Sequence, residues 1–144
     1  MIQRIQSIYL LLVTLLSGVL VFYFKIGAND NLGDYYILDL FNHESLLFKS
    51  ISFSFWLVAL LALINVFNFK NRKLQININR FNILINLILL GLLAYHLLNL
   101  SGETFVSEKG IGSFIPLGSI VLLVMANKAI RKDENLVKSV DRLR

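Results

Sequence analysis

The chain has 144 residues, of which 56% are hydrophobic and 16% charged, and its formal net charge is +5. Soluble domains are about 45–50% apolar and about 25% charged, so this composition, with one proline and eight glycines, indicates a polytopic membrane protein and excludes a disordered or collagen-like chain. The absence of cysteine excludes disulfides, thiolate metal sites and thiol redox chemistry.

The first apolar run covers residues 7–24 and follows a short polar start that carries Arg4. A run of about 18 or more apolar residues is long enough to cross the hydrocarbon core as a helix. A signal peptide is the alternative, with Arg4 in its basic region, but no Ala-x-Ala-like cleavage site follows Phe24. We therefore expect an uncleaved first span.

Residues 25–49 form the expected first loop, and residues 50–69 the second span. Tyrosines prefer the interface between lipid and water, so the apolar centre of this loop, residues 35–41, is expected to lie against the outer membrane face. Asn42 is the expected N-cap of the second span.

The basic stretch Lys70-Asn71-Arg72-Lys73 separates the second span from the third, which covers residues 81–100. Residues 76–79 alternate between apolar and polar as a strand does. A lone strand has no pairing partner between two spans, so the sequence favours a turn followed by an early start of the third helix.

Three asparagines, Asn65, Asn82 and Asn86, are predicted to form a polar cluster within the membrane. Asn82 and Asn86 lie four residues apart and therefore share one helical face. Asparagines in membrane helices commonly join one helix to another, with about 0.6 kcal/mol per hydrogen bond. We interpret the cluster as such a contact rather than as a binding site.

The fourth span covers residues 110–126 and contains Pro116, which is predicted to kink the helix because its ring removes the bond to Gly112. A broken helix rich in glycine can expose carbonyl groups to a ligand, as in transporters. The favoured alternative is that its small residues allow tight packing.

Residues 127–144 are predicted to form a charged, amphipathic helical tail that lies on the membrane or on a partner. Glu134 precedes Lys138 by four residues, which is the favourable order for an ion pair on a helix surface. The chain thus divides into a transmembrane domain, residues 1–126, and a cytoplasmic tail, residues 127–144.

Positive charge is distributed unevenly between the two sides of this topology. Only Lys25, Lys49 and Lys109 of the 14 lysines and arginines fall on the side opposite the basic connector. The positive-inside rule then places the connector and both termini in the cytoplasm. The sequence predicts an all-α protein with four transmembrane helices in an up-and-down bundle. Topology and attraction to anionic membrane lipid explain the basic charge, so no nucleic-acid partner is expected.

We expect no enzymatic activity and no cofactor. No acidic residue lies inside a predicted span, and the sequence has no nucleophile–base pair, metal-ligand cluster or phosphate-binding glycine loop. His43, His96 and Met125 are possible haem ligands. However, His43 is in a loop and Met125 lies toward the opposite face, so we interpret His96 as an interfacial hydrogen-bonding residue.

Three stretches of the chain resemble a family of small bacterial inner-membrane proteins with four spans, described as a domain of unknown function. They are residues 1–12, the connector Arg72-Lys73-Leu74-Gln75, and residues 126–134 with 141–144. The resemblance covers essentially the whole chain. It implies a Gram-negative inner membrane, and it brings no activity and no catalytic residues.

The expected function is that of an accessory protein that binds a protein partner at the cytoplasmic face. The residues expected to contact the partner are Arg4, Arg72, Lys73, Gln75, Arg131, Lys132, Asp133, Glu134, Asp141 and Arg142. One alternative is a small transporter or channel subunit that uses Pro116 and the asparagine cluster, and another is a redox subunit with haem or quinone near His96. The oligomeric state is left open.

Overall fold

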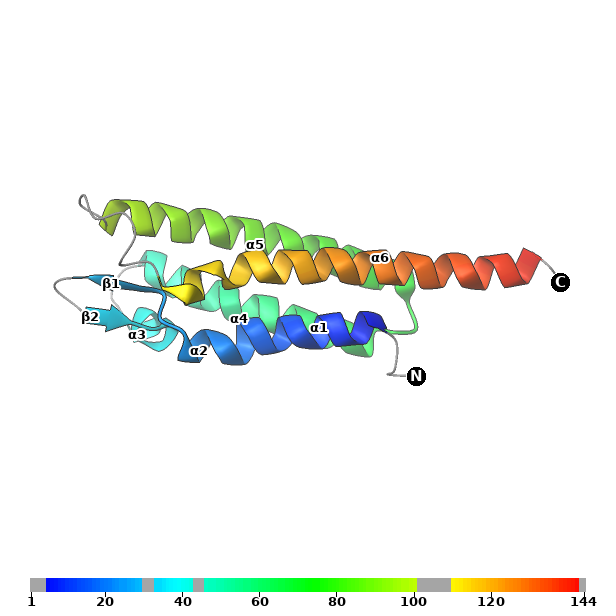
Figure 1. The fold of residues 1–144 in the computed structure, drawn as a ribbon, viewed down its shortest axis with the longest axis horizontal. Helices are drawn as coiled ribbons and strands as arrows, with labels where there is room; N and C mark the ends of the chain where they lie inside the picture. The colour runs from blue at the N-terminus through cyan, green and yellow to red at the C-terminus, as the bar shows by residue number, and fades with distance from the viewer. Residues whose placement is uncertain (1–4, 30–32, 43–45, 101–109, 143–144) are drawn as a thin grey trace.

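Four helical rods lie side by side and alternate in direction in the computed structural model of the chain (Figure 1). The structure describes residues 5–29, 33–42, 46–100 and 110–142. The first rod, which contains α1, packs on α4 and α6, and α5 also packs on α4 and α6. The predicted helical architecture with four long apolar helices is therefore confirmed, with one small hairpin added to it.

The first rod consists of α1 (Ile5–Leu15), a π-helical turn (Leu16–Leu20) and α2 (Val21–Tyr23). The turn directs small residues at both neighbouring helices. Ser17 Oγ lies 3.1 Å from Ser119 Oγ of α6, and a Cβ atom on Gly18 would lie 3.1 Å from Ala59 Cβ of α4. Small residues allow close approach of membrane helices, and here they bring three of them together.

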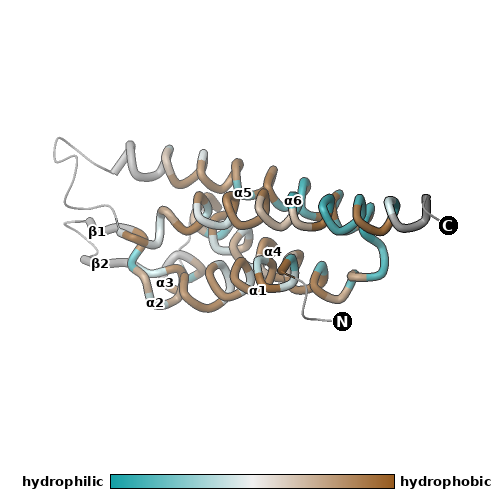
Figure 2. Tube along the Cα trace, turned by 45° about the vertical axis from the view of Figure 1, so that its right-hand side comes forward, coloured by the Kyte–Doolittle hydropathy of each residue, from teal (hydrophilic) through white to brown (hydrophobic). Residues whose placement is uncertain are grey.

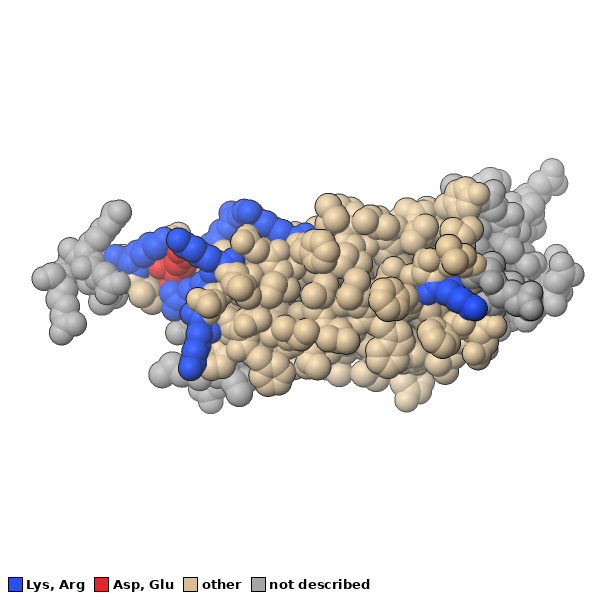
Figure 3. All heavy atoms as spheres, turned by 180° about the vertical axis from the view of Figure 1, so that it is seen from behind, with Lys and Arg blue, Asp and Glu red and all other residues tan. Residues whose placement is uncertain are grey.

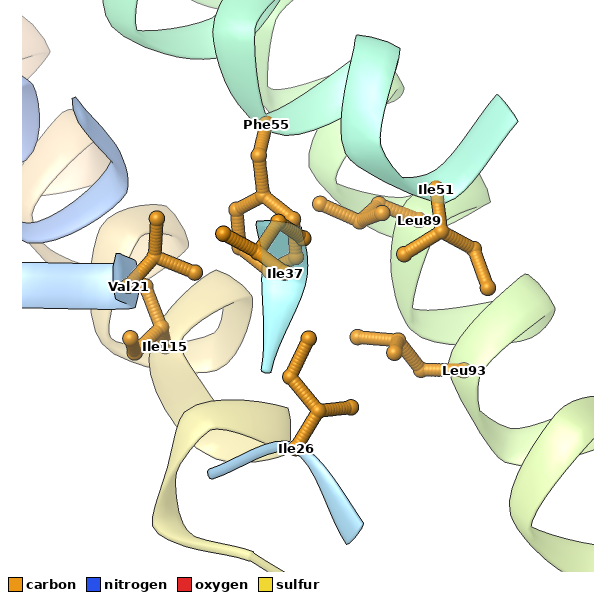
Figure 4. Close-up of a cluster of buried hydrophobic side chains, with 8 residues drawn as sticks. All are labelled: Val21, Ile26, Ile37, Ile51, Phe55, Leu89, Leu93 and Ile115. Atoms are coloured by element: carbon orange, nitrogen blue, oxygen red, sulfur yellow. The ribbon is translucent and has the colours of Figure 1, made fainter. Parts of the chain in front are cut away.

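A β-hairpin and a short helix cover the end of the bundle at which the first rod ends. Strands β1 (Gly27–Asn29) and β2 (Gly33–Tyr35) pair antiparallel, and α3 (Ile37–Asn42) follows them. Ile37 is buried in the centre of an apolar cluster (Figure 4), and Ser52 Oγ donates a 3.1 Å hydrogen bond to its carbonyl oxygen. This cluster consists of Val21, Ile26, Ile37, Ile51, Phe55, Leu89, Leu93 and Ile115.

Of the two expectations about this loop, one stays a prediction and one is wrong. Ile37 fills the apolar end of the bundle, whereas Leu38 and Phe41 of the same helix stay exposed, so the contact of residues 35–41 with the outer membrane face stays a prediction. Asn42 does not cap the second span, because it ends α3 and α4 begins at Leu46.

Helices α4 (Leu46–Phe67) and α5 (Arg72–Leu100) are joined by a tight connector. The backbone N–H of Asn68 donates to the carbonyl of Asn65, and that of Asn71 donates to the carbonyl of Asn68. The predicted early helix start is confirmed, because residues 76–79 lie within α5. A helix of 29 residues is about 44 Å long, which exceeds the roughly 30 Å of a hydrocarbon core.

The last rod begins with a 3-10 turn (Ile111–Phe114) and continues as α6 (Ile115–Arg142). Pro116 is the second residue of α6, where a missing N–H costs no helical hydrogen bond. The predicted kink inside the fourth helix is therefore wrong, because Pro116 marks the start of the α-helix. The helix then continues without a break past residue 126, the predicted end of the transmembrane domain.

Four helical segments are long and apolar enough to cross a membrane: Ile5–Tyr23, Leu46–Phe67, Arg72–Tyr95 and Ile111–Ser139. Hydrophobic residues dominate the middle of the bundle, and hydrophilic ones gather near the connector and along the second half of α6 (Figure 2). Many large apolar side chains face outward along these segments, as lipid requires and water disfavours. These features are those of a multi-pass membrane protein.

Two glycines dock the start of the last rod against the end of the first. The N–H of Gly110 donates to the carbonyl of Ile26, and the N–H of Gly112 donates to the carbonyl of Lys25, both at 3.0 Å. A Cβ atom on Gly110 would overlap the Lys25 carbonyl group. The close contact therefore requires glycine at residue 110.

We predict that Gly110→Ala lowers the thermal stability of the protein in detergent, because overpacking against backbone costs about 1–3 kcal/mol. Gly118→Ala is the matched control, since a Cβ atom at Gly118 meets nothing within 4 Å. Thermal unfolding followed by circular dichroism would show a lower midpoint for the first variant alone. Equal midpoints for both variants would contradict the docking contact.

Candidate functional site

One face of α5 carries a column of side-chain amides that lies inside the bundle. Gln75, Asn79, Asn82 and Asn86 are fully buried, whereas Asn77 on the same helix is exposed. Their spacing of four, three and four residues keeps them on one side of the helix. The inner surface of α5 is therefore polar in its first half.

Asn65 links α4 to the part of this column that lies nearest the connector. Its Nδ2 donates to the Gln75 carbonyl at 2.9 Å and to Asn79 Oδ1 at 2.7 Å, and Gln75 Nε2 donates to the Asn65 carbonyl at 3.0 Å. Asn79 Nδ2 then donates to Asn127 Oδ1 of α6 at 3.0 Å. Side-chain amides thus join α4, α5 and α6 at one level of the bundle.

A second pair of amides lies deeper in the bundle. Asn82 Nδ2 donates to the Val58 carbonyl of α4 at 3.2 Å, and Asn86 Nδ2 donates to the Asn82 carbonyl at 2.9 Å. The predicted cluster of Asn65, Asn82 and Asn86 is thus buried as a whole, but its members bond in two groups. Asn65 belongs with Gln75 and Asn79, and Asn82 belongs with Asn86.

The column can bind neutral polar groups, and it cannot titrate. Asn65 Oδ1, Gln75 Oε1 and Asn86 Oδ1 are buried and have no hydrogen-bond partner among the described residues, and the same holds for Gln6 Nε2 of α1. Carboxamides offer donors and acceptors without changing their charge, so this site is suited to holding helices together. Among the described residues, no group of three histidines or carboxylates could hold a metal ion.

The connector and α6 meet at the charged end of the bundle. Arg72 Nη2 lies 3.1 Å from Asp133 Oδ2, and its Nη1 donates to the Asp133 carbonyl at 3.4 Å. One turn further along α6, Lys138 Nζ donates to Glu134 Oε1 at 2.7 Å. The start of α5 is thus fixed to the part of α6 that leaves the bundle.

Two hollows flank α6 at this end. The first, called the connector cleft below, has a volume of about 530 Å³ and is lined by Phe69, Lys70, Asn71, Arg72, Lys73, Glu134 and Val137. The second follows the other side of the helix, called the outward face below, and is lined by Lys128, Arg131, Lys132, Asn135, Leu136 and Ser139. Lysine and arginine side chains gather at this end of the molecule, next to a broad surface without charge (Figure 3).

Residues 2–143 match a single family model, which is described as a domain of unknown function, DUF4293. The chain belongs to the DUF4293 family. The resemblance that its two ends and its connector indicate is therefore confirmed over nearly the whole chain. No curated protein and no solved structure matches it. The description of the DUF4293 family names no activity.

The residues predicted to contact a partner separate into several environments in this DUF4293 structure. The prediction that Gln75 contacts a partner is wrong, because its side chain is fully buried and donates a hydrogen bond to Asn65. Lys73, Arg131 and Lys132 are exposed.

The other predicted contact residues are paired or lie outside the description. Arg72 and Asp133 bind each other, and Glu134 binds Lys138. Arg4 lies outside the described residues, and so do the side chains of Asp141 and Arg142, although both belong to α6. The structure therefore brings Arg72, Lys73 and Glu134 together in the connector cleft and leaves Arg131 and Lys132 on the outward face.

Sequence reasoning missed several polar residues of the interior, namely Gln6, Ser17, Asn79, Ser119 and Asn127. The sequence does contain a signal for Asn79. Gln75, Asn79, Asn82 and Asn86 are spaced four, three and four residues apart, so Asn79 lies on the same inward face of α5 as the other three. The two serines and Asn127 give no comparable signal, since isolated polar residues fit either face of a membrane helix.

We predict that Asn79→Ala destabilises the bundle by about 1–2 kcal/mol, because it leaves the buried amide of Asn65 and the half-buried amide of Asn127 without their shared partner. Asn77→Ala is the matched control, since Asn77 is exposed on the same helix. Unfolding in a mixed-detergent titration would measure both free energies. Equal losses for the two variants would show that the buried network contributes nothing.

Proposed function

We propose that this DUF4293 protein is a non-enzymatic accessory protein of the bacterial inner membrane, and that it binds an acidic protein partner through the outward face of α6. The observation that carries the proposal is the unbroken course of α6, which extends past the other rods at the charged end (Figure 1). A helix that leaves a bundle in this way presents side chains to the aqueous phase.

The length and direction of α6 favour a soluble surface as its target. From Lys128 to Arg142 the helix rises by about 21 Å, which is more than the thickness of a headgroup layer. It keeps the direction of the bundle over this distance (Figure 1). A helix parallel to the spans cannot lie flat on the membrane that they cross, so a protein partner is favoured over the lipid surface.

Charge supports a cytoplasmic position for this end, with both termini inside. The described basic residues of the connector end are Lys70, Arg72, Lys73, Arg80, Lys128, Arg131, Lys132, Lys138 and Arg142, against Lys25 and Lys49 at the opposite end. Short loops rich in lysine and arginine stay on the cytoplasmic side of a membrane during insertion.

The outward face indicates the chemistry of the partner. Lys128, Arg131 and Lys132 line this face together with Leu136, which is 58% exposed. No ion pair joins these three basic residues to any other residue within the described ranges. Interfaces of this kind combine an apolar contact with complementary charge at its rim. The partner is therefore expected to present carboxylates around an apolar pocket.

The transporter alternative has less support than it had from the sequence. Pro116 lies in the first turn of α6 and does not open its middle. The amide of Asn82 donates to α4, and that of Asn86 donates to Asn82. No other observation favours a substrate path over an accessory role.

A photo-crosslinking residue placed at Leu136 in living cells is expected to form a discrete protein adduct. The same residue at Leu84, an exposed apolar position of α5, is the control and is expected to give no such adduct. Reversing the charge of the outward face with Arg131→Glu and Lys132→Glu is expected to reduce the Leu136 adduct at least about tenfold, because like charges then face each other.

Two outcomes would contradict the proposal. One is an adduct at Leu136 that persists after charge reversal, and the other is an identical adduct pattern at Leu136 and Leu84. Adducts would be identified by mass spectrometry, and membrane levels of each variant would be compared to exclude loss of the protein.

A further inference from the structure

The lining of the connector cleft carries more positive than negative charge. Its lining has three basic side chains, Lys70, Arg72 and Lys73, and one acidic side chain, Glu134. Arg72 is bound to Asp133, and Glu134 is bound to Lys138. Lys70 and Lys73 are exposed, and neither has an ion pair among the residues that the structure describes.

The start of α5 adds to this positive charge. The first turn of a helix favours acidic residues, since its free N–H groups carry partial positive charge. The first turn of α5 contains no acidic residue, and it contains Arg72 and Lys73 instead. An anion in the connector cleft would therefore interact favourably with two lysines and with the helix end at the same time.

The level of the cleft along the bundle matches the headgroup layer of a membrane. The apolar part of α5 begins after Arg80, and Lys73 lies about 10 Å beyond that residue along the helix. The headgroup layer adds about 5–7 Å on each side of the hydrocarbon core, and a lysine side chain reaches across the remainder. Phe69 and Val137 give the cleft an apolar wall suited to the upper part of a lipid.

We propose that the connector cleft binds the phosphate group of an anionic phospholipid, with Lys70 and Lys73 as its principal contacts. Arg72, fixed by Asp133, holds the wall of the cleft in place. The site is distinct from the outward face that is proposed to bind a protein, because the two lie on different sides of α6 and share no lining residue.

Native mass spectrometry of the full chain in a zwitterionic detergent would test this site. Phosphatidylglycerol is the probe, and phosphatidylcholine is the comparison lipid. The unchanged protein is expected to retain phosphatidylglycerol in preference. The double variant Lys70→Ala with Lys73→Ala is expected to bind it about thirtyfold more weakly, which is the effect of removing two lysines from an anionic surface.

Matched variants separate the site from general charge. Lys25→Ala with Lys49→Ala removes the same charge at the opposite end of the bundle and is expected to leave phosphatidylglycerol binding unchanged within about twofold. Lys70→Arg with Lys73→Arg keeps the charge and is expected to retain binding, which excludes misfolding as the cause of the alanine result. Equal weakening by both alanine pairs would overturn the proposal, as would no weakening by either.

A separate arm distinguishes a lipid from a soluble phosphate. Inorganic phosphate in large excess is expected to leave bound phosphatidylglycerol in place, because it lacks the apolar contacts to Phe69 and Val137. Displacement of the lipid by inorganic phosphate would assign the cleft to a soluble anion and overturn the lipid assignment. None of these results depends on the crosslink at Leu136, so the two proposals fail or stand separately.

Discussion

Exclusion of charge from the middle of the bundle is the constraint on which the rest of the structure depends. A charged side chain at the centre of a membrane helix costs about 2.5–3.5 kcal/mol or more. The lysines and arginines that the structure describes lie toward the ends, and the surface between them carries apolar side chains (Figure 3). Buried polarity within the described bundle accordingly comes from neutral side chains, which include the amides along α5, Asn65 of α4, and the hydroxyls of Ser17 and Ser119.

These neutral groups decide how the helices meet. Asn65 binds Gln75 and Asn79 across the α4–α5 contact, and Asn127 binds Asn79 across the α5–α6 contact. With the helices held at this level, the first residue of α5 reaches α6, where Arg72 binds Asp133. The connector cleft and the outward face both follow from this arrangement, because each requires α6 to pass close to the connector before it leaves the bundle.

The arrangement of the long helices was accessible from the sequence, because it depends on run length and charge. Four apolar runs of sufficient length predict the four rods. The third run begins after Arg80, whereas α5 begins at Arg72, so the first turns of this long helix are polar. Predictions from the sequence were wrong where they depend on the direction in which a side chain points. Hydropathy does not reveal that Gln75 points inward, nor that Ile37 fills the end of the bundle.

Pro116 shows the same limit in the backbone. Its effect depends on the residue at which α6 begins, and that start is set by the docking of Gly110 and Gly112 on the carbonyls of Ile26 and Lys25, contacts between residues more than eighty positions apart. The candidate site was predictable only in part for a similar reason. Its basic residues stand out in the sequence, but their division between the connector cleft and the outward face requires the course of α6.

We propose that the charged end of this bundle, with both proposed binding surfaces, faces the cytoplasm. Because the chain has no cysteine, single cysteines at two exposed positions test it directly: Asn71→Cys in the connector and Asn42→Cys at the end of α3. In intact spheroplasts an impermeant maleimide is expected to label Asn42→Cys alone, and Asn71→Cys is expected to react only after the membrane is opened. Labelling of Asn71→Cys from outside would contradict the account.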